Sequence, residues 1–420
     1  MTAPPLGRDY RLLWSAAVSS RLGDALRTPA LALLAATLTR DPRVIAAVTV
    51  AGQLPPLLFG LLGGVYADRW DRRRTMAVVD GLRAAVIGAL ALAVALDRAG
   101  VAALVTVAFL LAALGTLFDA ASFAMLPSVV PPAALPRANG RLQAGSAVAG
   151  GFLGAPAAGV LFALAAPLPF AVDALTFLCA ALLTLALRPV PPRPRASPGR
   201  RSVWREGVEG VRWVRGDAML WRLTVATAGS NLAISGLMAV LVLYALDVLR
   251  VPPAGYGLFA AGAVLGGLAG GLGAGRLAAR LGTVPALRVV LAGQAVALTG
   301  LALARHPVPG GLALAVFAAG TTVWNGLWVS YGQRHVPPAL LGRVGAAQRM
   351  VGLLTAPVGA ALAGMAGAAY GVGPVAAAVA GVFVLVTLAA WRTLRPAAPA
   401  PAAGPTSVAT AARPGRRPSR

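Results

Sequence analysis

The chain has 420 residues, of which 58% are hydrophobic and only 12% are charged. So few polar residues cannot cover a soluble globule of this size, and we expect lipid to surround most of the protein. The formal net charge of +24 would suit a nucleic-acid partner, but every basic residue is Arg and none is Lys, a bias that weakens this interpretation, so no nucleic acid is expected.

The sequence carries no motif of an enzyme active site. Without Lys, a Walker A loop cannot form, because its phosphate-binding side chain is missing. Neither the HExxH zinc motif nor the GxSxG nucleophile motif occurs. The only cysteine, Cys179, lies in an apolar run, where a packed small side chain is expected. We therefore predict a non-enzymatic protein with no cofactor and no metal site.

Apolar runs long enough to span a bilayer, which takes about 20 residues, follow one another along the chain. Twelve are predicted: 12–38, 44–66, 76–96, 101–126, 142–165 and 168–187, then 220–249, 255–279, 285–304, 311–333, 346–369 and 372–392. They divide the chain into an amino-terminal bundle (1–187), a linker (188–218), a carboxy-terminal bundle (219–395) and a disordered cytoplasmic tail (396–420). Within the linker, the amphipathic stretch Val203–Val214 is predicted as a short surface helix.

Arginines collect on alternate connections, which predicts the orientation. The connections after even-numbered spans contain Arg69, Arg72, Arg73, Arg74, Arg137, Arg141, Arg276, Arg280, Arg334 and Arg343, besides the Arg-rich linker. The odd connections contain only Arg40, Arg43, Arg98, Arg250 and Arg305. Both termini are therefore predicted to be cytoplasmic, in a bacterial plasma membrane.

An internal repeat relates the two halves. Val130-Pro131-Pro132-Ala133, with Leu135 and Arg137, recurs 206 residues later as Val336-Pro337-Pro338-Ala339, with Leu341 and Arg343. The shift superimposes the connection after span four on that after span ten, so each repeat has six spans. Because six is even, the two halves are predicted to be parallel and related about the membrane normal.

The loop after the second span carries Gly64-Val65-Tyr66-Ala67-Asp68-Arg69-Trp70-Asp71-Arg72-Arg73-Arg74. It resembles the signature between helices two and three of the major facilitator superfamily, although Asp71 stands where Gly is usual. The resemblance covers essentially the whole chain, and it implies an all-α membrane protein of twelve transmembrane helices in two six-helix repeats. It also implies a transporter without enzymatic activity.

In this superfamily, the loop is thought to act as a latch that holds the outward-facing state. The resemblance assigns Gly64, Asp68, Arg69, Arg72 and Arg73 to such a latch, with Arg280 as the counterpart in the second half. By position, Asp80, Arg83 and Asp119 lie nearer the cytoplasmic ends of spans three and four, so we also expect them in the latch network. The alternative is that these charges only set topology or are solvated at the membrane boundary.

A narrower resemblance is to the drug and siderophore exporter branch that includes macrolide and enterobactin exporters. It is carried by Tyr10-Arg11-Leu12-Leu13-Trp14, Leu22-Gly23-Asp24, Asp173-Ala174, Gly255-Tyr256-Gly257-Leu258 and Val323-Trp324-Asn325. On span five, Gly154, Pro156 and Gly159 resemble the helix-five signature of antiporters, while simple close packing is the alternative. The Arg-containing fourth-helix motif of many drug antiporters is absent.

Ionisable residues inside spans are costly and are candidate functional sites. Asp24 lies about twelve residues, roughly 18 Å, into span one, and is the only carboxylate that length alone places near mid-bilayer. Arg21 and Arg27, three positions to either side, are within reach of it on neighbouring turns. We expect a proton-coupling cluster that faces the cavity, with a structural ion pair as the alternative. Asp173 lies near the outer end of span six, where we expect a structural polar contact, with substrate binding as the alternative.

The second half has no acid deep in a span, so any proton chemistry belongs to the first half. Asn231, Asn325, Trp324, Trp328 and Gln294 are candidates for the opposite wall of the substrate cavity, although packing is a common role for such aromatics.

We therefore expect secondary active export of small amphipathic molecules, antibiotic or siderophore-like, by alternating access. The partners would be the substrate, protons and the lipid bilayer. The alternatives are an uptake transporter for a small polar nutrient and a non-transporting membrane scaffold or receptor. Scarce hydrogen-bonding side chains in the spans argue against the first, and intramembrane charges argue against the second.

Overall fold

The computed structural model describes residues 6–69, 71–131, 134–188, 203–337 and 340–394, and within these ranges the regular structure is entirely helical. Among the described residues, eleven helical segments are long and apolar enough to cross a membrane. Helix α1 is not among these eleven, because Arg21, Asp24 and Arg27 make it less apolar. Its 31 residues nevertheless extend about 46 Å, which is long enough to cross a membrane. With α1, the described part of the chain provides the twelve predicted spans.

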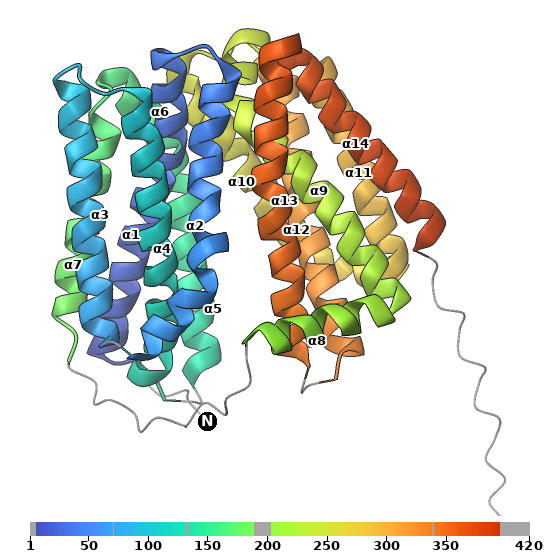
Figure 1. Cartoon of the computed structure of the whole chain (residues 1–420), viewed down its shortest axis with the longest axis horizontal. Helices are drawn as coiled ribbons and strands as arrows, with labels where there is room; N and C mark the ends of the chain where they lie inside the picture. The colour runs from blue at the N-terminus through green and yellow to red at the C-terminus, as the bar shows by residue number, and fades with distance from the viewer. Residues whose placement is uncertain (1–5, 70, 132–133, 189–202, 338–339, 395–420) are drawn as a thin grey trace, which may run out of the picture.

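The amino-terminal bundle contains six spans (Figure 1). They are α1 (Arg8–Leu38), α2 (Pro42–Arg69), α3 (Arg72–Ala95), α4 (Val101–Val129), the continuous segment of α5 (Leu135–Ala147), η2 (Val148–Gly154) and α6 (Ala155–Leu164), and α7 (Leu168–Leu185). The fifth span changes to π-helical geometry at η2, a feature that often marks functional segments.

The carboxy-terminal bundle repeats this arrangement. Its spans are α9 (Ala218–Leu243) continued by η3 (Tyr244–Val248), α10 (Pro253–Leu281), α11 (Thr283–Leu303), α12 (Pro307–His335), α13 (Leu341–Tyr370) and α14 (Val372–Thr393). Span four ends at Val129 and span ten at His335, which is the 206-residue shift of the sequence repeat. The prediction of two six-helix repeats is confirmed.

Helix α8 (Val203–Gly216) connects the bundles and lies along one end of the carboxy-terminal bundle (Figure 1). Val214 is buried there with Leu220, Val336 and Val344. The basic side chains of Arg212 and Arg215 are exposed, as expected for an amphipathic surface helix.

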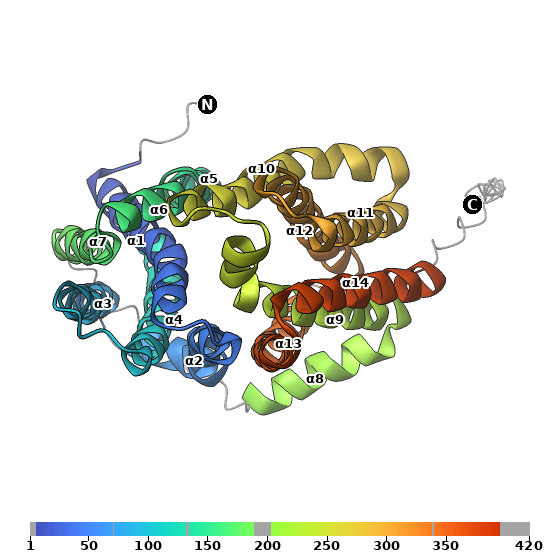
Figure 2. The ribbon, with the colours of Figure 1, turned by 90° about the horizontal axis from the view of Figure 1, so that it is seen from above.

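The two bundles lie side by side and diverge toward the end of the molecule at which the amino terminus lies (Figures 1 and 2). At the opposite end they touch: Nη1 of Arg40 is 2.8 Å from Oδ1 of Asp247. Nearer the middle, Nε2 of Gln53 donates to Oγ of Ser235 at 2.9 Å. The conformation is therefore closed at the end away from the amino terminus.

Candidate functional site: a charge cluster inside the amino-terminal bundle

Helix α1 brings three charged side chains to one level, since Arg21, Asp24 and Arg27 are spaced three residues apart. Oδ1 of Asp24 lies 2.7 Å from Nη2 of Arg27, and its Oδ2 lies 3.8 Å from Nη1 of Arg21. The sequence prediction that these three residues meet is confirmed. Asp24 is only 21% exposed, so its charge depends on these partners rather than on water.

Arg83 of α3 occupies the centre of the site. Its Nη2 donates to Oδ1 of Asp24 at 2.7 Å, while its Nη1 donates to Oγ of Ser20 at 3.0 Å and to Oδ1 of Asp80 at 3.3 Å. The guanidinium also stacks over Phe177 of α7, with its Cζ 4.1 Å from the ring centroid. A buried guanidinium with two carboxylate partners and an aromatic face is well compensated for its loss of water.

Two further carboxylates border this centre. Nη2 of Arg21 lies 2.6 Å from Oδ1 of Asp119 on α4, in a pair whose side chains are about half exposed. Nη1 of Arg27 lies 3.9 Å from Oδ2 of Asp173 on α7, which is fully buried. We call the seven residues the charge cluster: Arg21, Asp24, Arg27, Asp80, Arg83, Asp119 and Asp173.

This geometry changes the sequence interpretation in two places. Asp80, Arg83 and Asp119, which we expected in the latch network, belong to the cluster around Asp24, because α3 and α4 turn these side chains toward α1. Asp173 joins the same cluster, because α7 packs against α1 and α3. Asp24 is consequently not the only carboxylate at its level. The spacing of Asp80 and Arg83, three residues apart inside an apolar span, was the available signal for a buried pair.

The latch candidates are described only in part. Helix α2 continues through Gly64, Asp68 and Arg69, but these side chains lie outside the described residues. Arg72 donates to Oγ of Ser128 at 3.5 Å, and Arg73 donates to the carbonyl of Leu185. These contacts tie the start of α3 to the ends of α4 and α7. Arg280 lies exposed in the last turn of α10.

Polar side chains in the carboxy-terminal bundle gather on α9, α12 and α13. Trp324 is 4% exposed and donates to Oγ1 of Thr227 at 3.2 Å, so it packs between α12 and α9 rather than lining an open wall. Asn231 is half-buried beside Gly352, and Asn325 is exposed.

Three further buried atoms near that region have no hydrogen-bond partner: Oγ of Ser230, Nε1 of Trp328 and Nε2 of Gln348. By contrast, Gln294 is satisfied inside the bundle, where it donates to Oγ1 of Thr321 at 2.9 Å. Gln294 is therefore a structural residue, and Ser230 and Gln348 are candidates that the sequence alone did not suggest.

The small residues of span five contact both bundles. A Cβ added at Gly154 would overlap Ala25, the neighbour of Asp24 on α1. A Cβ added at Gly159 would lie 2.8 Å from the carbonyl oxygen of Ala254 and 2.9 Å from the amide of Gly257 on α10. Pro156 lies just after η2 inside this continuous span, where its missing N–H leaves a carbonyl of the preceding turn without its helical donor. Close packing explains these glycines, and it places span five between the charge cluster and the opposite bundle.

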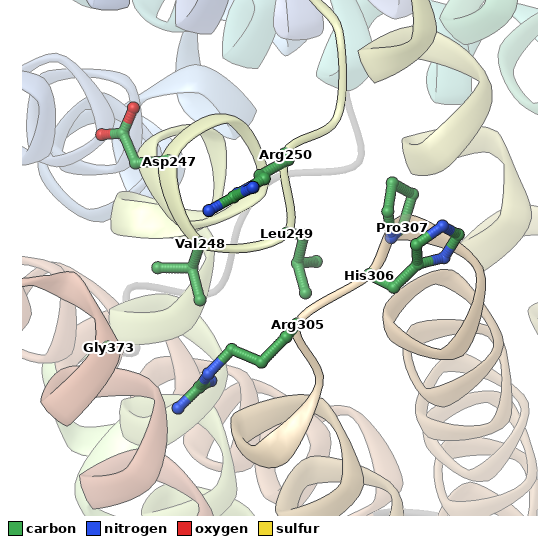
Figure 3. A pocket seen from close by; sticks show the side chains of 8 residues that line it. All are labelled: Asp247, Val248, Leu249, Arg250, Arg305, His306, Pro307 and Gly373. Atoms are coloured by element: carbon green, nitrogen blue, oxygen red, sulfur yellow. The ribbon is translucent and has the colours of Figure 1, made fainter.

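A pocket of about 900 Å³ lies at the closed end of the carboxy-terminal bundle (Figure 3). Its lining is Asp247, Val248, Leu249, Arg250, Arg305, His306, Pro307 and Gly373. Figure 3 shows Arg250 and Arg305 entering it from two different loops. No residue of the charge cluster lines this pocket, so the pocket is separate from the candidate site.

Two six-helix bundles, one of which encloses an intramembrane charge cluster, define a multi-pass membrane transporter. The sequence matches the Major Facilitator Superfamily over residues 13–360, and the chain belongs to this family. No curated protein matches the sequence.

Solved structures share the fold. A bacterial homologue of the iron transporter ferroportin, in an inward-facing state, has a TM-score of 0.75 and 16% identity, covering 94% of this chain and 100% of its own. A bacterial homologue of the human lysosomal transporter Spinster, inward-facing and unoccupied, has a TM-score of 0.74 and 15% identity, with coverages of 94% and 98%. The nucleoside transporter NupG has a TM-score of 0.73 and 15% identity, with coverages of 93% and 100%. At such identities the likeness concerns the fold alone.

Proposed function

We propose that this transporter exports small amphipathic molecules, antibiotic or siderophore-like, in exchange for protons. The observation that carries the proposal is the charge cluster, in which four carboxylates and three guanidiniums meet inside one bundle. Such groups are costly in a membrane and are typical of ion and proton pathways. A carboxylate that changes partners between two conformations can bind a proton in one and release it in the other.

The proposed orientation places both termini in the cytoplasm of a bacterium, because Arg collects on the connections at that end. The closed end, where Arg40 meets Asp247, then faces outward, and the conformation is inward-facing. The likeness to inward-facing structures supports this assignment. In the opposite conformation the bundles would close at the cytoplasmic end, where Gly64, Asp68, Arg69, Arg72, Arg73 and Arg280 would form the latch.

The polar groups of the carboxy-terminal bundle support a partly hydrophobic substrate. The unpartnered atoms of Ser230, Trp328 and Gln348 offer a few hydrogen bonds on α9, α12 and α13, together with Asn231 and Asn325. A metal cation is disfavoured as substrate, because Arg21, Arg27 and Arg83 stand between the carboxylates and would repel it.

Transport by the purified protein in vesicles tests the proposal. A panel of fluorescent amphipathic compounds is loaded, and an acid-inside or acid-outside gradient is imposed on vesicles that contain only this protein. We expect at least one compound to move opposite to the proton flow and to accumulate on the acidic side of the membrane. This accumulation should disappear when the proton gradient is collapsed. Movement of a polar nutrient with the protons would favour uptake. Absence of any gradient-driven flux across the panel would favour a scaffold and overturn the proposal.

A further inference from the structure

The charges of the cluster do not balance. It contains four carboxylates, from Asp24, Asp80, Asp119 and Asp173, but only three guanidiniums. If every carboxylate were ionised, the cluster would carry one uncompensated negative charge inside the bundle. A buried unpaired charge is costly enough that the group takes up a proton instead. The cluster therefore holds one proton in the conformation described.

Asp24 and Asp119 are poor candidates for this proton. Oδ1 of Asp24 receives two guanidinium contacts at 2.7 Å, from Arg27 and Arg83, and both favour its ionised form. Asp119 contacts Arg21 at 2.6 Å and is 56% exposed, so water and a close cation stabilise its charge. Both carboxylates are thus held ionised.

Asp80 and Asp173 are both fully buried, but their contacts differ. Oδ1 of Asp80 accepts from Arg83 at 3.3 Å, which leaves only Oδ2 without a partner. Neither oxygen of Asp173 has a hydrogen-bond partner, and its nearest cation, Nη1 of Arg27, is 3.9 Å away. Asp173 is therefore the carboxyl group whose ionised form the described structure stabilises least.

The neighbours of Asp173 explain this isolation. From α1, Gly23 lies against Oδ1, while Arg27 and Asp24 lie on the same helix face. From α3, Asp80 and Arg83 are engaged with each other.

The remaining neighbours add no charge. Helix α6 contains no titratable residue. On α7 itself, Thr176 lies beside the carboxyl group of Asp173 and donates to the backbone carbonyl of that residue, and Cys179 is exposed.

Arg27 links this carboxyl group to Asp24. One amino group of its guanidinium, Nη2, contacts Asp24 at 2.7 Å, while the other, Nη1, has no hydrogen-bond partner and is 3.9 Å from Asp173. A shift of about 1 Å would bring Nη1 within hydrogen-bond distance of Asp173. An ionised Asp173 would attract the guanidinium, and a protonated one would leave it with Asp24.

We propose that Asp173, rather than Asp24, carries the exchangeable proton, and that Arg27 moves from Asp24 toward Asp173 when this proton leaves. The step transfers one proton from the Asp173 carboxyl group to water, and no other bond changes. Movement of Arg27 would also shift α1 where Ala25 packs against Gly154 of span five. Because span five contacts the opposite bundle, that bundle would be affected too. This inference rests on the proposed proton coupling, but its first test needs no substrate.

Infrared spectroscopy of the purified full-length protein in lipid nanodiscs detects the C=O stretch of a protonated carboxyl group. We expect one such band from a buried group in the wild type, shifted in frequency in Asp173→Glu and unchanged in both Asp80→Glu and Asp119→Glu. Glu keeps the carboxyl group, so each variant has the same number of charges in the cluster as the wild type. A shifted band in Asp80→Glu with an unchanged band in Asp173→Glu would move the proton to Asp80 and overturn the proposal.

Transport provides the second test, with a compound from the vesicle assay. Asp173→Asn mimics the protonated form permanently, so gradient-driven export should fall at least tenfold while exchange without a gradient continues. Asp97→Asn, in an exposed turn outside the charge cluster, is the matched control and should keep gradient-driven export. Equal loss of both transport modes in Asp173→Asn would indicate a structural role and overturn the assignment. If no compound is transported by the wild type, the proposed function fails, and the infrared result still decides where the proton is.

Discussion

Gly23 of α1 lies directly against Asp173 of α7: a Cβ atom at position 23 would overlap Oδ1 of Asp173 and Oγ1 of Thr176. This contact lets α1 and α7 approach closely enough for Arg27 to lie between Asp24 and Asp173. Gly23→Ala should therefore push the two helices apart and lower the free energy of unfolding by about 1–3 kcal/mol. Thermal unfolding in detergent measures the effect.

Gly81→Ala is the control for that change. Gly81 lies on α3 with no atom within 4 Å of an added Cβ, so the substitution should be neutral or stabilise the helix by up to about 1 kcal/mol. Equal stability of the Gly23→Ala and Gly81→Ala variants would contradict the close contact of α1 with α7.

Asp24 is the shared acceptor of two guanidiniums, and Asp24→Asn would leave Arg27 and Arg83 with one carboxylate fewer. Because removing one partner of a buried ion pair costs about 3–5 kcal/mol, this variant should lose stability as well as transport. Adding Arg27→Gln removes a guanidinium that has lost its closest carboxylate, so the double variant should recover part of the unfolding free energy. A single variant as stable as the wild type would show that the two arginines do not depend on Asp24.

Gly257 of α10 packs closely against span five. A Cβ at this position would overlap the carbonyl oxygen of Ala155 and lie 2.9 Å from the amide of Gly159. Gly257→Ala should open the closed end of the transporter. Spin labels at the exposed positions Arg43 and Tyr370, near the facing ends of α2 and α13, should then report longer distances.

Gly273→Ala is the matched control on the same helix, because an added Cβ there meets no atom within 4 Å. It should leave the distance distribution unchanged. Identical distributions for the Gly257→Ala variant and the wild type would mean that this contact does not hold the end closed.

The ion pair of Arg40 with Asp247 joins the bundles at the same end, but its side chains are 64% and 48% exposed. Such a pair contributes at most about 1 kcal/mol, and salt screens it. Arg40→Gln should shift the population of closed molecules by no more than about fivefold at low salt and leave it unchanged at high salt. The same spin labels measure this, and exchanging the two residues should restore the wild-type distribution. A larger shift that salt does not reduce would show that the pair is a principal lock.

The number of spans, the six-span repeat, a surface helix at Val203–Val214 and the meeting of Arg21, Asp24 and Arg27 could all be predicted from the sequence. All of these depend on neighbouring residues, because hydropathy and a spacing of three residues, which is about one helical turn, are local properties. Even α1, whose charges interrupt its apolar run, was recognisable by its length.

The surroundings of Asp24 depend on how distant segments of the chain pack together. Arg83 is 59 residues away in the chain and Asp173 is 149 residues away, and each reaches the cluster only because α3 and α7 pack against α1 in one rotation about their axes. Each step of one residue turns a side chain by about 100°, so two candidate faces of a helix can be equally apolar in sequence and lead to different partners. The sequence shows how many charged residues lie inside the membrane. How these residues pair, and which carboxyl group is left without a partner, depends on how the helices pack.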